Sequence, residues 1–299
     1  MISGALLVDK PSGPTSHDIV ARVRRALGVS RIGHTGTLDP LATGLLVLLV
    51  GNVTRLAQFL AGDLKEYLAD VRLGIATETY DAEGLDLSHR SPGGELPALE
   101  TIAAALDRFR GTFDQVPPHF SAKKVAGRRA YEAARDRKPV DLRPVTVTVH
   151  DLELVSRTDD VVRLRVLCSA GFYVRSLAHD LGVALGCGAH LAGLRRTKAG
   201  VFSVEQATAL ATIEHEGAEV AARLLPSETL LAHLPGLRLS EDGARRAAHG
   251  NLIGPAHLTE VSGTADGAER LRLLDPGGRL VAVAERQGDG SLHPVVVLV

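Results

Sequence analysis

The residues best suited to chemistry lie in a polar, glycine-rich loop at positions 31–44, which contains His34 and Asp39. This loop runs directly into the apolar segment 45–50, which is typical of a core strand. Loops anchored by a rigid strand often present catalytic groups. Asp39 could act there as a nucleophile or base, although Asp39-Pro40 is equally typical of the start of a turn. A catalytic carboxylate in a partly dry site needs a cationic partner to stay ionised.

Two residues farther along the chain could complete such a site. Arg175 lies near the start of an expected helix, outside its apolar stripe, so it could pair with Asp39 or be a solvated surface residue. Tyr67 begins a segment in which apolar and polar residues alternate, as in a strand. Its ring could act in the site or simply pack in the core. His34 could be a general base, a metal ligand, a stacking plane or a structural loop residue.

Several common kinds of active site are absent from the sequence. Nothing near His34 supplies further ligands at a spacing known for metal sites, and Cys168 and Cys187 form neither a C-x-x-C pair nor a zinc motif. The sequence has no G-x-x-x-x-G-K-[ST] phosphate loop, no dinucleotide fingerprint after a strand and no G-x-S-x-G serine elbow. We therefore expect no metal site and no bound cofactor.

The composition indicates a globular protein whose basic charge is local. Its 299 residues suffice for one large domain and a smaller one. The chain has 34 Lys and Arg against 35 Asp and Glu, but residues 123–143 contain eight basic and three acidic residues. This basic segment is a candidate arm for phosphate contacts. No stretch approaches the ~20 apolar residues of a membrane span, and no secretory signal is visible, so we expect a cytoplasmic protein.

The apolar periodicity predicts the elements that must position these residues. Thr15 and Asp18 form a capping-box pattern before a helix that should end at Gly28. Further helices are expected at 97–110 and from about 173. The expected strands lie at 6–8, 45–50, 65–73, 145–154, 161–168, 271–274, 280–284 and 295–298. A change of pattern near 225–235 predicts a boundary before a small β-rich module.

Taken together, these segments resemble the bacterial tRNA pseudouridine-55 synthases, the TruB family, over about 230 residues in the right order. The loop from Gly33 to Gly44 is similar to the catalytic loop of that family. The other matching motifs are Lys10-Pro11-Ser12-Gly13-Pro14-Thr15-Ser16, Lys65-Glu66-Tyr67, Ser121 to Gly127 with Tyr131 and Arg135, Tyr173-Val174-Arg175-Ser176-Leu177 with Asp180-Leu181-Gly182, and Leu194-Arg195-Arg196-Thr197.

The resemblance implies catalytic roles for Asp39 as the nucleophile, Arg175 as its ion-pair partner and Tyr67 as the residue that stacks on the target uracil. The target nucleotide would flip out of the RNA. The reaction would break the N1–C1′ bond and rejoin the base through C5, without a metal or nucleotide cofactor. Asp39 would be ionised whether it attacks C1′ of the ribose or C6 of the uracil. We favour elimination to a glycal-type sugar, with Asp39 or Tyr67 assisting removal of the 2′ proton.

The resemblance also implies a substrate-binding set. His34 would enter the T-loop of the tRNA, and Lys10, Pro11 and Leu194 would support the site. Lys124, from the basic segment, completes the set. Specificity would then come mainly from the shape of the T-loop, which is how proteins usually read folded RNA.

The fold implied by the resemblance is α+β. Residues 1–232 would form a pseudouridine-synthase fold, with a central mixed, mainly antiparallel β-sheet flanked by helices and loops. An RNA-contacting thumb would lie at about 120–143. Residues 233–299 would form a small β-rich, PUA-like RNA-binding domain.

The expected partner is tRNA, bound through its T-loop and T-arm by a monomer that needs neither a membrane nor a guide RNA. Three other functions are possible: a tRNA-binding or folding protein without turnover, an enzyme for a small nucleoside, and a pseudouridine synthase for another RNA. The presence of Asp39, Arg175 and Tyr67 argues against the first. A basic arm and an additional module of RNA-binding size argue against the second.

Overall fold

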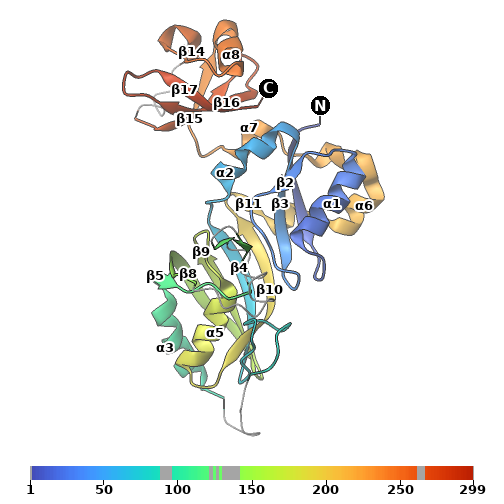
Figure 1. Ribbon diagram of the computed structural model, residues 1–299, viewed down its shortest axis with the longest axis vertical. Helices are drawn as coiled ribbons and strands as arrows, with labels where there is room; N and C mark the ends of the chain where they lie inside the picture. The colour runs from blue at the N-terminus through green and yellow to red at the C-terminus, as the bar shows by residue number, and fades with distance from the viewer. Residues whose placement is uncertain are drawn as a thin grey trace.

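The structure is a computed structural model that describes residues 2–87, 96–120, 142–260 and 267–298, with the backbone alone of 124–125 and 128–129. In this part of the chain, strands form one large mixed sheet covered by helices and one smaller sheet near the C-terminus. Figure 1 shows the smaller sheet at one end of an elongated molecule. The predicted α+β class is confirmed.

The large sheet contains ten of the described strands. These are β1 (Gly4–Lys10), β2 (Ile32–His34), β3 (Thr43–Val50), β4 (Lys65–Leu73), β5 (Gly111–Gln115), β8 (Val145–Thr158), β9 (Val161–Cys168), β10 (Ala189–Ala199), β11 (Phe202–Ser203) and β12 (Thr208–Ala209). Their order is β12-β1-β3-β10-β4-β9-β8-β5, with β2 beside β3 and β11 beside β10. Only the pairs β1·β12 and β3·β10 are parallel among these strands. The sheet is therefore mixed and mainly antiparallel.

The helices are mostly short. They are α1 (Ser16–Leu27), α2 (Ala57–Leu60), α3 (Leu99–Leu106), α5 (Val174–Ala184), α6 (Leu210–Glu216), α7 (Ser227–Leu230) and α8 (Glu241–Ala248), with 3₁₀ turns η1 (Gly51–Leu56), η2 (Asp107–Phe109), η3 (Val204–Gln206), η4 (Gly217–Arg223) and η5 (Pro255–His257). The predicted capping box is present at α1, where the Thr15 side chain accepts from the Asp18 amide. Gly28 ends this helix in the left-handed conformation, as predicted.

Two hydrophobic cores meet at the centre of the large sheet. The first core packs α1, α6 and η4 against β1 and β3, around residues such as Leu46. The second packs α3 and α5 against β4, β8 and β9, around residues such as Leu177. Figure 1 shows these two helix groups over different ends of the sheet. Tyr67 of β4 and Leu194 of β10 contact both cores, so their side chains lie where the two halves join.

The parallel pairing of β3 with β10 requires a glycine at this junction. Gly44 lies opposite Arg196 and has a φ angle of +95°. A Cβ atom on Gly44 would lie 2.3 Å from the carbonyl oxygen of Arg196. Because both the backbone conformation and the close approach exclude a side chain, Gly44 lets the two halves of the sheet come together.

The smaller sheet packs against the large one through η1. Its strands are β13 (Gly236–Leu239), β14 (Leu258–Glu260), β15 (Arg270–Leu274), β16 (Leu280–Arg286) and β17 (Leu292–Val297), in the order β14-β13-β15-β16-β17. Asn52 Nδ2 donates to the Leu298 carbonyl at 2.8 Å, and Arg55 Nη1 donates to the Val297 carbonyl at 2.7 Å. Val283 packs in the same core as Leu49, so the two sheets share buried apolar surface.

Most predicted elements are present, but their ends differ. Strand β8 continues to Thr158, and the helix expected at 97–110 is the shorter α3 followed by η2. The long strand β10 and the shorter strands β2, β5 and β11 to β14 were not predicted. The sequence of β5, GTFDQ, lacks a continuous apolar pattern because it is an edge strand paired only with β8. Within the described ranges, no helix is long and apolar enough to cross a membrane.

We predict that Gly44→Ala lowers the free energy of unfolding by about 3 kcal/mol, because the new methyl group adds overpacking to backbone strain. The matched control is Gly28→Ala, where φ is also positive but nothing lies within 4 Å of the new Cβ. That control should cost only about 1 kcal/mol. Urea denaturation of both variants measures the difference. Equal losses would contradict the close approach of β3 and β10.

Candidate active site

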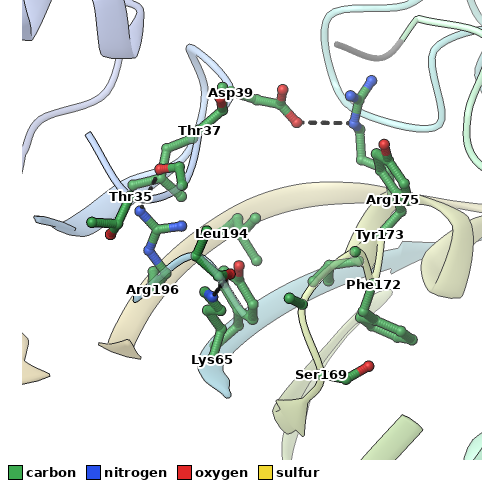
Figure 2. Close-up of a pocket in the computed structure, with 17 residues that line it drawn as sticks. Thr35, Thr37, Asp39, Lys65, Ser169, Phe172, Tyr173, Arg175, Leu194 and Arg196 are labelled. Carbon is green, nitrogen blue, oxygen red and sulfur yellow. Dashed lines mark hydrogen bonds and ion pairs between the residues drawn. The ribbon is translucent and has the colours of Figure 1, made fainter. Parts of the chain in front are cut away.

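A pocket of about 370 Å³ opens at the junction of the two halves of the sheet. The residues that line it are Thr35, Gly36, Thr37, Leu38, Asp39, Ala61, Lys65, Tyr67, Ser169, Ala170, Gly171, Phe172, Tyr173, Val174, Arg175, Leu194 and Arg196. They come from the 35–39 loop, β4, β10 and the segment before α5. Figure 2 shows Asp39 and Arg175 pointing toward one another across it. The volume lies in the range of pockets that hold small molecules.

The Asp39 loop is held in place by hydrogen bonds from helix α1 and from the segment that connects β1 to it. Ser16 Oγ donates to the Leu38 carbonyl at 3.0 Å, and the Leu38 amide donates back to Ser16 Oγ at 2.8 Å. The Gly13 amide donates to the Pro40 carbonyl at 2.9 Å. These bonds fix the backbone on both sides of Asp39, so its carboxylate is presented by a rigid loop.

Lys10 supports the same loop from behind. Its side chain is fully buried, and its ammonium donates to the carbonyls of Pro11, Pro40 and Ala42 at 3.0, 3.1 and 2.6 Å. Burial lowers the pKa of Lys10 to about 8, while the nearby Asp39 carboxylate acts in the opposite direction. Lys10 is therefore still mainly cationic at neutral pH, and its three donors match three carbonyl acceptors.

Arg175 occupies a buried position at the first turn of α5, not the solvated surface position that the sequence left open. Its Nε lies 3.0 Å from Asp39 Oδ2, and its Nη1 lies 3.4 Å from Asp81 Oδ2. Nη1 also donates to the Thr79 carbonyl at 3.3 Å, and Nη2 donates to the Phe120 carbonyl at 2.9 Å. These contacts leave the guanidinium little freedom to turn away from Asp39.

The Asp39 side chain is accessible from the pocket, but its surroundings disfavour a charged carboxylate. Its side chain is 39% exposed, whereas those of Arg175 and Asp81 are 7% and 5% exposed. Burial raises the pKa of Asp39 above its usual value, and the Asp81 carboxylate contributes in the same direction. Arg175 is the main group that lowers this pKa, with a smaller contribution from Lys10. The ion pair with Arg175 is thus the contact that most favours the anionic form of Asp39.

Tyr67 and Leu194 form the apolar wall of the pocket. They come from β4 and β10 and pack where the two cores meet. Burial raises the pKa of the Tyr67 hydroxyl, although the Arg196 guanidinium, which is hydrogen-bonded to it, opposes this. The hydroxyl is therefore protonated at neutral pH. A half-buried ring beside a leucine suits a flat, uncharged ring as its ligand.

Arg196 contributes a buried cation on the same wall. Its Nε donates to the Leu45 carbonyl at 2.7 Å and its Nη2 to the Gly36 carbonyl at 3.0 Å. A β-bulge after Arg196 gives β10 one extra residue, Thr197, relative to β4. Lys198 therefore pairs with Glu66 on the opposite face of the sheet and does not share the face of Arg196.

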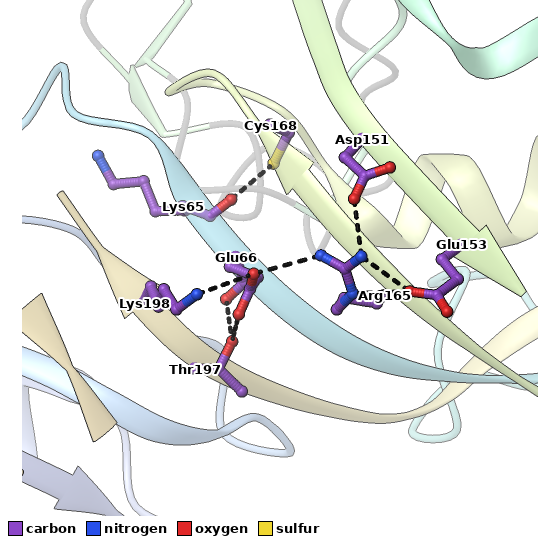
Figure 3. Close-up of polar contacts among 8 residues, drawn as sticks. All are labelled: Lys65, Glu66, Asp151, Glu153, Arg165, Cys168, Thr197 and Lys198. Carbon is purple, nitrogen blue, oxygen red and sulfur yellow. Dashed lines mark hydrogen bonds and ion pairs between the residues drawn. The ribbon is translucent and has the colours of Figure 1, made fainter. Parts of the chain in front are cut away.

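Glu66 fixes this bulge from the back of the sheet, as Figure 3 shows. Thr197 Oγ1 donates to Glu66 Oε1 at 2.8 Å, and Lys198 Nζ lies 3.3 Å from Glu66 Oε2. Arg165 Nη1 lies 3.5 Å from the same oxygen and also pairs with Asp151. These charged contacts lie outside the pocket, and they stabilise the local register of β10 that directs Arg196 into the pocket.

His34 lies on β2 and is not among the residues that line the pocket. Its ring meets the His17 ring edge-on, with centroids 5.8 Å apart. Burial lowers the pKa of His34, and His17 and Arg196 lower it further. Nδ1 of His34 has no hydrogen-bond partner within the described ranges. A neutral imidazole of this kind can stack or hydrogen-bond, but it carries no charge to attract phosphate.

The structure brings together Asp39, Tyr67, Arg175 and Leu194 in one pocket. Lys10 and Pro11 lie behind the catalytic loop, where the lysine ammonium and the proline carbonyl bond to each other. The backbone of Lys124 lies in β6 (Lys124–Val125), which pairs with β7 (Arg128–Arg129), but its side chain lies outside the described residues.

Sequence reasoning missed three members of the site, Lys65, Arg196 and Asp81. The first two could have been found, because Lys65 and Tyr67, like Leu194 and Arg196, are two residues apart on a strand and so share a face. No such spacing marks Asp81 in the sequence, because Asp81 lies in a turn after β4 and contacts Arg175 from there. Among the described residues, no group of three or more His, Cys, Asp or Glu is arranged to hold a metal ion.

Comparison with known families assigns this chain to a class of enzyme. The family model "TruB family pseudouridylate synthase (N terminal domain)" matches residues 24–174, and "tRNA pseudouridylate synthase B C-terminal domain" matches residues 175–232. The chain belongs to the TruB family. It is therefore a pseudouridine synthase, an isomerase.

Full-length relatives agree with this assignment. The chain is 45% identical to tRNA pseudouridine synthase B of Thermobifida fusca, over 99% of both chains. It is 41% identical to the protein of that name from Solibacter usitatus, over 99% of this chain and 100% of the relative. Among solved structures, a chain of a Cbf5-Nop10-Gar1 complex aligns with a TM-score of 0.75 at 27% identity, covering 99% of this chain and 85% of that one.

A second solved structure has the same fold. A chain of an H/ACA RNP bound to a substrate RNA containing 2′-deoxyuridine aligns with a TM-score of 0.72 at 25% identity, over 99% of this chain and 85% of the other. The predicted TruB resemblance and the predicted pseudouridine-synthase fold are both confirmed.

In this TruB-family protein, we predict that Arg175→Met raises the pKa of Asp39 further, because it removes the cation that lowers that pKa most. The carboxyl signal of ¹³C-labelled aspartate, assigned with Asp39→Asn, follows this titration by NMR. Arg163→Met is the control, since Arg163 pairs with Asp70 at 2.7 Å away from the pocket. An unchanged or lower pKa of Asp39 in Arg175→Met would contradict the proposed ion pairing.

Proposed function

We propose that this protein isomerises the T-loop uridine at position 55 of tRNA to pseudouridine by base flipping, without a guide RNA and with Asp39 as the catalytic carboxylate. The observation that carries this proposal is the Asp39–Arg175 ion pair, 3.0 Å long, across the pocket of a TruB-family chain. The substrate is supported by the relatives named tRNA pseudouridine synthase B, which match the whole chain. A tRNA substrate also favours the cytoplasm as the site of action.

The pocket supports a mechanism that begins with base flipping. A uridine within a folded loop must leave its stack before a protein carboxylate can reach it, at a cost of a few kcal/mol. The Tyr67 ring, beside Leu194, offers a new stacking surface worth roughly 1–3 kcal/mol. Among the titratable residues that line the pocket, Lys65, Arg175 and Arg196 are cationic and Asp39 is anionic. Their charge balance favours an anionic RNA strand.

The chemical step is assigned to Asp39. Tyr67 is a poor base at neutral pH because its pKa is raised by burial, so removal of the ribose 2′ proton falls to the Asp39 carboxylate. Elimination would then break the N1–C1′ bond and release the uracil as an anion beside a glycal-type sugar. After the base turns, C5 bonds to C1′, C2′ regains a proton and C5 loses its hydrogen to solvent. Arg175 compensates the charge of Asp39 throughout.

Recognition of the rest of the tRNA is assigned to surfaces around the pocket. His34 would enter the T-loop as a neutral ring, and the basic segment that contains Lys124 would contact phosphates as a thumb at about 120–143. Residues 233–299 would act as a PUA-like RNA-binding domain beside the catalytic domain at 1–232. Hydrogen bonds join η1 to the end of the smaller sheet. They would hold the RNA-binding surfaces of the two domains at a fixed separation.

We predict that Asp39→Asn binds unmodified tRNA as wild type does but releases tritium from C5-labelled uridine roughly 10⁴-fold more slowly, or not at all. C5 loses its hydrogen only when the base rejoins through that carbon. Asp70→Asn is the matched control, because Asp70 is paired with Arg163 on the same sheet, away from the pocket. The wild type should release about one equivalent of tritium per tRNA, and none when the T-loop uridine is changed.

Each other outcome of that assay counts against the proposal in a different way. Retained release by Asp39→Asn would show that Asp39 is not the catalytic carboxylate. Tight binding by the wild type without release would favour a protein that only binds or folds tRNA. Release from another uridine would overturn the assigned position.

We predict that Tyr67→Phe keeps its affinity for tRNA, because the aromatic surface is retained, but reacts about 10-fold more slowly once the hydroxyl can no longer bond to Arg196. Tyr67→Leu should also weaken binding, by the roughly 1–3 kcal/mol of a lost stack. Filter binding and single-turnover rates separate the two effects. Equal affinities for the Phe and Leu variants would contradict the stacking role.

A further inference from the structure

Tyr80 adopts an unusual backbone conformation next to the catalytic arginine. Its φ angle is +65°, and in the described ranges only Asp159 is another non-glycine residue with positive φ. A bulky side chain in this region is strained and needs its surroundings to hold it there. The neighbours of Tyr80 in sequence are Thr79 and Asp81, whose carbonyl and carboxylate both contact the Arg175 guanidinium. The strained residue thus lies between the two groups that orient Arg175.

The Tyr80 ring stacks on His179 of helix α5. The two ring centroids are 3.8 Å apart and the planes differ by 13°. His179 follows Arg175 by four residues, so the two side chains lie on the same face of the helix, one turn apart. One face of α5 therefore carries both the arginine and the ring against which the 79–81 turn rests.

Polar contacts of His179 do not explain its position. Its Nδ1 atom is buried and has no hydrogen-bond partner within the part of the chain that the structure describes. Burial lowers the pKa of His179, and burial together with Asp180 raises that of Tyr80, so both rings are uncharged at neutral pH. The contact that remains is ring on ring, which two neutral aromatic groups favour.

Thr79 and Asp81 already contact Arg175 of α5, and further hydrogen bonds of the turn run to β10 and within the turn itself. The Leu191 amide donates to the Tyr80 carbonyl at 2.9 Å, and the Ala82 amide donates to the Leu191 carbonyl at 3.0 Å, both on β10. Within the turn, Thr77 Oγ1 donates to the Asp81 carbonyl at 2.7 Å. These bonds shape the turn and tie it to the sheet. Apart from the contacts of Thr79 and Asp81 with the Arg175 guanidinium itself, the Tyr80–His179 stack is what joins the turn to α5.

We propose that Tyr80 and His179 are positioning residues for Arg175: their stack fixes the 79–81 turn against α5 so that the Thr79 carbonyl and the Asp81 carboxylate aim the guanidinium at Asp39. This inference rests on the proposed function, in which Arg175 must compensate the Asp39 charge. Neither ring lines the pocket, so neither touches the flipped base. Loss of the stack would leave Arg175 present but less well aimed.

The test compares Tyr80→Gly with Tyr80→Phe. Glycine removes the ring yet tolerates the positive φ angle, and phenylalanine keeps the ring. We expect Tyr80→Gly to lower the single-turnover rate of tRNA modification by about 10-fold or more, since small misplacements of a catalytic group are costly. Its affinity for tRNA should stay within about twofold of wild type, and Tyr80→Phe should match wild type in both measurements.

A second readout does not depend on turnover. The Nε–H signal of Arg175 in an NMR spectrum, assigned with Arg175→Lys, reports its hydrogen bond to Asp39. We expect slow hydrogen exchange of this signal in wild type and Tyr80→Phe, and faster exchange in Tyr80→Gly. If wild type does not modify tRNA, the proposed function fails, whereas this signal still tests the stack. Unchanged rate and exchange in Tyr80→Gly would overturn the inference.

His179→Ala tests the same contact from the helix, in case Tyr80→Gly fails to fold. It should lower the rate and speed the exchange as Tyr80→Gly does. If the two rings act only through each other, the double variant should be no slower than the slower single variant. Additive losses, or a wild-type rate in His179→Ala, would show that the stack does not position Arg175.

Discussion

The arrangement of the pocket depends on one ion pair, in which Arg175 balances the charge of Asp39. Asp39 faces the pocket, where burial raises its pKa, and Arg175 is the group that opposes this most strongly. A buried guanidinium is itself costly unless its donors are satisfied. Arg175 therefore also needs Asp81 and the carbonyls of Thr79 and Phe120. The ion pair is stable only as part of a network that four separate segments of the chain supply.

The fold places this network where the two halves of the large sheet join. Each half has its own hydrophobic core, and Tyr67 and Leu194 contact both. Gly44 allows β3 and β10 to approach closely enough to close the junction. The pocket residues Tyr67, Leu194 and Arg175 are thereby held by packed strands and by the first turn of a helix, which position side chains more firmly than loops alone.

Charge is organised locally in this protein. The whole chain is close to neutral, yet the pocket gathers the cations Lys65, Arg175 and Arg196, and Lys10 lies behind its loop. The ammonium groups of the two lysines bond to backbone carbonyls, so their charge helps shape the site.

The sequence by itself determined what depends on neighbours along the chain. The capping box and Gly28 define helix α1, alternation predicts β4 with Tyr67 on its buried face, and a polar loop before a core strand marks Asp39. The family motifs added the TruB fold. Only the tertiary structure decided whether Arg175 was a surface residue or the partner of Asp39. Periodicity specifies which face of an element is buried, but contacts between distant segments depend on sheet register, bulges and helix packing, which no local pattern encodes.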